Sequence, residues 1–537
     1  MIDQRIAEKV VQQFGRRVIA YVCNVDEEDV DSLVKHSSAL NSVRARVLEK
    51  VIITLLQARM QAAYEGFPTE MFVSLMNFNR EDGRHQFNVW REEAGGELPS
   101  FHSEDPVLQA LADLAVDEYP FLLLTRSRSA GSFPYQPTSS NLFRHPASAK
   151  FQAAVLDDER LSLLFPKKGA DSLSTRGSYR ASTGLGGGHQ LVVLSSSLLR
   201  AGYVLTRLKT ADLQPISLFD SLATVIEMAR KAAQGQVVPV PAFVGFSNIA
   251  LEAPPAQLPW GVIKKYSERY AEFTPPEAQP STWTPPNEAG AVAAGFILET
   301  TYPYELNISD EDSEDATPEW PASLVTGRQE LDYHCELTSL ALSLAIERNP
   351  PAAAHPAWTL IFDPLTSSGA STSWRLPVLQ QLEPYFVKDS DDIQGLIDWA
   401  RLLASTDDTK IRITQRRLLT ALSYRQDAVD GFIDAVVAWE NLFGSGQGEL
   451  AFRVSAAMAS LLERDAKNRL NLQRRISKQY NLRSKVVHGG QELTGERAIQ
   501  ERNEALTLLV RALRKLYRDH SHLINREERA REIILTL

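Results

Sequence analysis

A change in the spacing of apolar residues near Asp407 constrains the fold of this chain more than any other feature. Beyond it, apolar residues recur at intervals of three and four, as at Val429, Phe432 and Val436. This spacing is typical of helices that bury one stripe and expose the rest of their surface. We therefore predict an all-α bundle over residues 407–537.

The part of the chain before this bundle divides into two regions. Residues 1–125 have helical spacing, as at Val10, Phe14 and Val18, and predict a helical N-terminal domain. A length of 537 residues also favours several domains over one core. The predicted fold class is multidomain, with a helical N-terminal region, a mixed α+β middle region over residues 126–406 and the all-α C-terminal bundle. We interpret the middle region as a sensing or regulatory unit.

The middle region mixes strand-like and helical patterns. Short apolar runs are typical of strands, and a helical pattern is centred on Leu218 to Lys231. Five prolines between residues 272 and 290 favour an extended linker or a long surface loop. The strand-like runs are Leu191–Leu194, Tyr203–Leu205, Val237–Phe246 and Trp358–Phe362.

The segment Val18–Val30 faintly resembles a helix-turn-helix, with Asn24 at the turn. Its second helix would begin with Glu27, Glu28 and Asp29, and these carboxylates would repel DNA phosphates. We therefore expect a structural or dimerising element here rather than a reader of DNA.

Composition limits the classes of function. A formal net charge of −10 argues against a surface built entirely for nucleic acid, so any such binding must be local. Cys23 and Cys335 lie too far apart in the sequence to suggest a disulfide framework or a thiolate metal site. The longest apolar run, Ala289–Leu298, is shorter than the roughly 20 residues of a membrane span, and the first residues lack a secretory signal pattern. We expect a cytoplasmic protein without a membrane, metal or cofactor requirement.

Arg483 and His488 form the candidate site. Five positions separate them, which on an ideal helix is about 140°, so they would not share a face of an unbroken helix. Gly489 and Gly490 follow directly and predict that the helix ends here, since glycine often terminates helices.

Other charged residues are candidates to support Arg483 and His488. Glu440 falls on the apolar stripe of its helix, where a carboxylate needs a partner. Arg453, on the next helix, is the predicted partner, in either a structural ion pair or one that steadies an active site. Residues 463–485 also carry a local excess of positive charge, which fits either a solvated face or capture of a polyanion. The basic residues are Arg464, Lys467, Arg469, Arg474, Arg475, Lys478, Arg483 and Lys485, against Glu463 and Asp465.

Three sequence words carry a resemblance to a known family. They are DAVVAWENL at Asp434–Leu442, GELAFR at Gly448–Arg453 and YNLRSKVVHG at Tyr480–Gly489. With these words in this order, residues 427–517 resemble the higher eukaryotes and prokaryotes nucleotide-binding (HEPN) superfamily, most closely its Apea-like branch. The third word contains the R-x-x-x-x-H motif of that superfamily.

The resemblance implies a helical domain that forms a homodimer or higher oligomer and joins two motifs into one cleft that cuts RNA without a metal. Arg483 and His488 would be catalytic. Glu440, Arg453 and Ser484 would support them, although Ser484 departs from the Asn, Asp or His often found after the family arginine. Contacts to the RNA substrate would come from Tyr480, Arg474, Arg475, Lys478 and Lys485.

The chemistry of these residue types agrees with that implication. Attack by a ribose 2′-hydroxyl needs a base, an acid and positive charge on the phosphate, which histidine and arginine supply. One histidine per chain is too few for both proton transfers, which gives dimerisation a catalytic reason. We expect an endoribonuclease acting as a bacterial toxin or phage-defence protein, with a phage-derived or nucleotide trigger at the N-terminal region. The alternative is a non-catalytic HEPN module for dimerisation or nucleotide binding in a regulatory protein.

Overall fold

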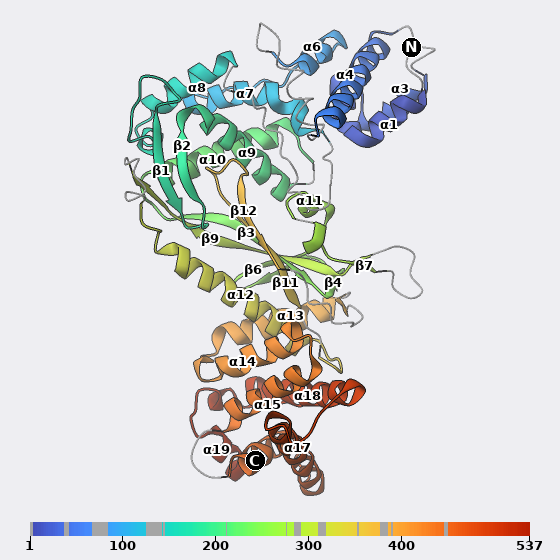
Figure 1. Ribbon diagram of the computed structural model, residues 1–537, viewed down its shortest axis with the longest axis vertical. Coiled ribbons are helices and arrows are strands. Elements are labelled where there is room, and N and C mark those ends of the chain that lie inside the picture. Colours follow the sequence, from blue (N-terminus) through green and yellow to red (C-terminus); the bar gives the residue numbers. More distant parts are fainter. Residues whose placement is uncertain are drawn as a thin grey trace.

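Helices form both ends of the molecule, and antiparallel sheets lie between them, in the computed structural model (Figure 1). This arrangement confirms a mixed helical and α+β chain, while the predicted domain boundaries stay a prediction. The structure describes the chain apart from residues 1–3, 37–41, 67–83, 125–141, 143–144, 211, 275, 284–291, 310–317, 352–353, 376–384, 388–389 and 445–448.

The N-terminal region is helical, as predicted. Asn24 follows α2 with a φ of 50°, a left-handed conformation that asparagine tolerates better than most residues. The turn predicted at Asn24 is therefore confirmed, and Glu27 and Glu28 lie exposed in a 3₁₀ turn after it. The helices are α1 (Gln4–Phe14), α2 (Arg16–Cys23), α3 (Val30–His36), α4 (Val43–Glu65), α6 (Gln86–Glu93) and α7 (Pro106–Leu122), and α8 (Pro146–Asp157) follows in the middle region.

Two of the predicted strands are wrong. Leu191–Leu194 and Tyr203–Leu205 lie in one helix, α9 (Leu191–Lys209), which packs beside α10 (Pro215–Ala233). Helix α9 is buried around most of its circumference, so its sequence lacks the polar face by which a surface helix is recognised. It is long and apolar enough to cross a membrane, but 83% of its apolar stretch is buried inside the protein. This burial fits a core helix of a soluble protein.

The main sheet has six strands with antiparallel neighbours. The predicted strands at Val237–Phe246 and Trp358–Phe362 are confirmed as parts of β3 and β11. Pro239 and Pro241 lie in the half of β3 that extends beyond its pairing with β11, where a missing N–H breaks no ladder bond on that side. In spatial order the strands are β12 (Ala370–Trp374), β11 (His355–Phe362), β3 (Val238–Ser247), β9 (Gly295–Tyr304), β6 (Gly261–Lys265) and β5 (Ala256–Leu258).

The proline-rich segment 272–290 joins β6 to β9, two neighbours in this sheet. Residues 275 and 284–290 lie outside the described part, so the assignment of this segment as a linker or a long surface loop stays a prediction. Smaller sheets complete the region. They are β10 (Leu306–Ser309), β1 (Arg176–Ala181) and β2 (Gly186–Gln190), the parallel pair β4 (Ile249–Leu251) and β13 (Tyr385–Val387), and the pair β7 (Thr282–Trp283) and β8 (Val292–Ala293), with the short helix α11 (Glu268–Ala271) after β6.

The C-terminal helices attach to the sheet region through α12. Arg514 donates hydrogen bonds to the carbonyls of Leu344 (2.8 Å) and Ile346 (2.6 Å) at the C-terminal end of α12, where cations are favoured. Figure 1 shows α12 and α13 between the sheet and the C-terminal helices. The helices are α12 (Ser323–Ala345), α13 (Ser390–Ser405), α14 (Arg412–Leu419) with the π-helical turn η7 (Thr420–Tyr424), α15 (Ala428–Phe443), α16 (Leu450–Leu462), α17 (Ala466–Val487), α18 (Gly495–Asp519) and α19 (Arg529–Thr536).

Asp434 ties α15 to the preceding helix. Its buried carboxylate lies 2.5 Å from Arg417 and 2.6 Å from Arg425. We expect Asp434→Asn to lower the free energy of unfolding by about 2 kcal/mol, because two charge-assisted bonds weaken while both arginines remain partly hydrated. Urea denaturation measures the change, and Asp430→Asn is the control because its carboxylate is 55% exposed and 3.7 Å from Arg425. Equal midpoints for both variants would contradict this role.

Candidate functional site

Helix α17 carries most of the candidate residues, and its end is well defined. The Gly490 N–H donates to the carbonyl of Lys485 at 2.8 Å, and Gly489 has a left-handed φ of 71°. Glycine adopts this conformation without steric cost, and the pattern is that of a Schellman motif. The predicted end of the helix is therefore confirmed, and His488 is its capping residue.

Glu440 of α15 is the hub of the site. Its Oε1 accepts a hydrogen bond from the Tyr480 hydroxyl at 2.6 Å, and Nη1 of Arg483 lies 3.5 Å from the same oxygen. The second distance is long for a hydrogen bond, so Arg483 is held mainly by charge. Its Nε is buried and has no hydrogen-bond partner among the described residues. The side chains of Arg483 and Glu440 are 22% and 20% exposed, so the guanidinium is turned inward but still reaches solvent.

The predicted pairing of Glu440 with Arg453 stays a prediction. Arg453 lies half-buried on α16, while the contacts that the structure gives for Glu440 come from α17. Ser484 is half-buried, and its carbonyl accepts the His488 backbone N–H at 3.1 Å. Gly448, the first residue of the second sequence word, lies outside the described residues.

His488 lies on the exposed face of α17 together with three basic residues. Arg474, Lys478 and Lys485 are exposed, and on an ideal helix they lie within roughly 80° of His488. Arg483 lies about 180° from Arg474, on the side that faces α15. A polyanion on the exposed face would therefore meet His488 before Arg483.

Two predicted RNA contacts have partners within the chain. Arg475 forms an ion pair with Glu504 of α18, and Tyr480 donates its hydroxyl to Glu440. Contact of either with RNA stays a prediction, and the structure gives Tyr480 a hydrogen bond to Glu440 that the sequence did not suggest. Among the described contacts, the side chains of Arg483 and His488 share no hydrogen bond or ion pair. Within one chain the two side chains are therefore not in contact.

Burial raises the pKa of Tyr480 to about 12, and its hydrogen bond to the Glu440 carboxylate acts in the same direction. Its hydroxyl therefore stays a donor at neutral pH, and its contribution to stability is complete below pH 10 and lost as the pH rises through about 12. We expect the tyrosinate absorbance difference between wild type and Tyr480→Phe to have a midpoint near pH 12. A midpoint near pH 10, the ordinary tyrosine value, would contradict the burial and the bond.

Asp434 is the residue that sequence reasoning missed, although it stands inside the first quoted word. Its signal was a carboxylate among apolar residues of α15, the same signal that identified Glu440.

No group of three His, Cys, Asp or Glu side chains within the described segments could hold a metal ion.

Comparison with known proteins adds no assignment. The chain matches no family model, no curated protein and no solved structure. The functional argument therefore rests on the sequence words and on the geometry around α17.

Proposed function

We propose that the C-terminal helices form a HEPN-type endoribonuclease that cuts RNA without a metal. The observation that carries the proposal is the exposed His488 at the end of α17, on the same face as Arg474, Lys478 and Lys485. The resemblance of the three sequence words supplies the reaction class. The chain would act as a toxin or phage-defence effector, with the N-terminal and sheet regions controlling it.

The reaction proceeds by attack of the ribose 2′-hydroxyl on the adjacent phosphate. A base removes the 2′ proton, the bond between phosphorus and the 5′-oxygen breaks, and an acid protonates the departing oxygen. The products are a 2′,3′-cyclic phosphate and a 5′-hydroxyl. His488 exchanges the protons, and Arg483 neutralises the phosphate oxygens with its planar, permanently charged fork.

The geometry of one chain supports a site made from two. Arg483 faces α15 while His488 faces outward, about 140° away around α17. A second chain facing the first would bring another histidine for the second proton transfer and another arginine for the phosphate. Glu440 would hold Arg483 until RNA arrives, and its 3.5 Å ion pair is loose enough to be exchanged for a phosphate.

The first test is cleavage of end-labelled single-stranded RNA by the full chain in EDTA. We expect fragments to accumulate at an unchanged rate when the chelator is present, and no cleavage of the DNA of the same sequence, which lacks the attacking hydroxyl. Cleavage that EDTA stops, or equal cutting of the DNA, would contradict the proposal.

One observation favours the alternative of a non-catalytic dimerisation or nucleotide-binding module. Arg483 already contacts Glu440 within the chain, and its side chain is only 22% exposed. In that role the ion pair is structural. The alternative then predicts that Arg483→Ala weakens self-association, measured by sedimentation, while wild type leaves RNA intact.

A further inference from the structure

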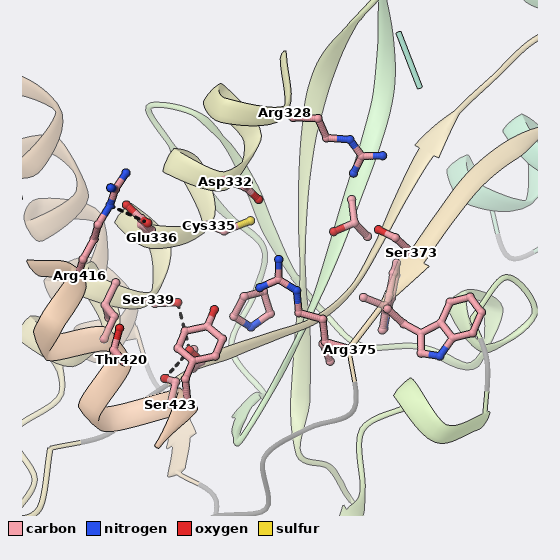
Figure 2. Close-up of a pocket in the computed structure, with 18 residues that line it drawn as sticks. Arg328, Asp332, Cys335, Glu336, Ser339, Ser373, Arg375, Arg416, Thr420 and Ser423 are labelled. Carbon is pink, nitrogen blue, oxygen red and sulfur yellow. Dashed lines mark hydrogen bonds and ion pairs between the residues drawn. The ribbon is translucent and has the colours of Figure 1, made fainter. Parts of the chain in front are cut away.

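A cavity of about 540 Å³ lies where the main sheet meets the C-terminal helices. Its walls come from α12, β11, the end of β12, α14 and η7 (Figure 2). The volume falls within the roughly 300–1,000 Å³ of small-molecule sites. Neither the sequence words nor the proposed reaction uses this cavity.

Positive charge exceeds negative charge on its lining. Arg328, Arg375 and Arg416 face Asp332 and Glu336. Arg416 lies 3.4 Å from Glu336, which largely satisfies both groups. That leaves Arg328 and Arg375 against Asp332, an excess of one positive charge.

Among the described residues, Arg375 is the arginine of the cavity whose side chain has no hydrogen-bond or ion-pair partner. Figure 2 shows its side chain extending from the end of β12 into the space between α12 and η7. Its guanidinium makes no hydrogen bond or ion pair with any residue described in the structure, while its backbone N–H donates a hydrogen bond to the carbonyl of Ala357 at 2.8 Å. Arg328 also lines the cavity, and one of its amino groups donates to the Thr183 carbonyl at 3.3 Å. A planar guanidinium with free donors is suited to binding carboxylate or phosphate.

Aromatic side chains line the same cavity. Trp374, next to Arg375, is 40% exposed, and Tyr424 of η7 is 37% exposed. Trp358 is buried, and its indole lies so close to Gly245 that a Cβ there would come within 2.1 Å. The indole therefore forms a fixed wall. Tyr424, whose ring meets that of His355 edge to face at a centroid distance of 4.9 Å, offers an apolar surface to a ligand.

We propose that this cavity binds a small organic anion that carries a phosphate or carboxylate group and a flat ring, about the size of a mononucleotide. Arg375 and Arg328 bind the anionic group, and Tyr424 packs against the ring. The proposal concerns binding alone, so it holds whether or not the chain cuts RNA.

Calorimetric titration of the full chain tests the site with two anions and their uncharged counterparts. Adenosine 5′-monophosphate is compared with adenosine, and N-acetyl-L-tryptophan with N-acetyl-L-tryptophanamide. We expect a single class of sites for at least one anion, with its counterpart at least about tenfold weaker. The anion that binds identifies the group as phosphate or carboxylate.

Arg375→Ala is expected to weaken that binding about tenfold or more, since it removes a charge-assisted contact. Arg375→Lys, which keeps the charge, should lose less. Arg401→Ala is the matched control, because Arg401 is an exposed arginine of α13 outside the cavity. Melting temperatures without ligand should be the same for all four proteins. Failure of both anions to bind, or equal affinity in Arg375→Ala and wild type, would overturn the proposal.

Discussion

Replacing His488 by alanine is expected to lower the rate of RNA cleavage by at least about 100-fold, the usual contribution of a proton-transferring side chain. Stability should not change, because the side chain is exposed and the hydrogen bond to Ser484 comes from the backbone N–H, which alanine keeps. The measurement is the initial cleavage rate at saturating RNA, together with the melting temperature.

His522→Ala is the control for the His488 variant. His522 is another exposed histidine of the C-terminal region, beyond the end of α18. It should keep the wild-type rate. Equal rates in His488→Ala and wild type would show that this histidine takes no part in the chemistry.

Arg483→Ala should lower cleavage by about 100-fold to 1,000-fold, as removal of a group that stabilises transition-state charge commonly does. It should also lower the free energy of unfolding by about 1 kcal/mol, because Glu440 loses a cation at a mostly buried position. Arg483→Lys should recover only part of the rate, since an ammonium group cannot form the bidentate fork.

The cleavage rates and unfolding free energies of Arg483→Ala and a control variant separate a role in the reaction from a role in stability. Arg511→Ala is the control, since Arg511 also pairs with a glutamate, Glu463 at 3.3 Å, but on α18 away from the site. A loss of stability in Arg483→Ala without any loss of cleavage would make the Arg483–Glu440 pair purely structural.

Local patterns predicted much of the C-terminal fold. The apolar stripe of α15 and the two glycines after α17 act through short-range physics, namely burial of one face and left-handed backbone. Helix α9 was missed because it is buried on most sides, and a short apolar run does not by itself distinguish a strand from a buried helix. The mixed composition of the middle region was predictable, but its strand order was not.

The sequence indicated the residues of the candidate site but not their contacts. The sequence indicated that Glu440 needs a partner, and nearness along the chain pointed to Arg453. The structure shows contacts of Glu440 with Tyr480 and Arg483, 40 and 43 positions away, and the pairing with Arg453 stays a prediction. The cavity near Arg375 could not be found in this way, since its lining comes from elements far apart in the sequence and carries no local pattern.

The most direct measurement of the central claim is the chemistry of the RNA ends after digestion in EDTA. Wild type, His488→Ala and Arg483→Ala are incubated with the same RNA, and the new 3′ ends are identified by mass spectrometry. The proposed mechanism predicts 2′,3′-cyclic phosphate ends from wild type and almost none from either variant. Fragments without a cyclic phosphate, or equal amounts of it from all three proteins, would contradict the mechanism.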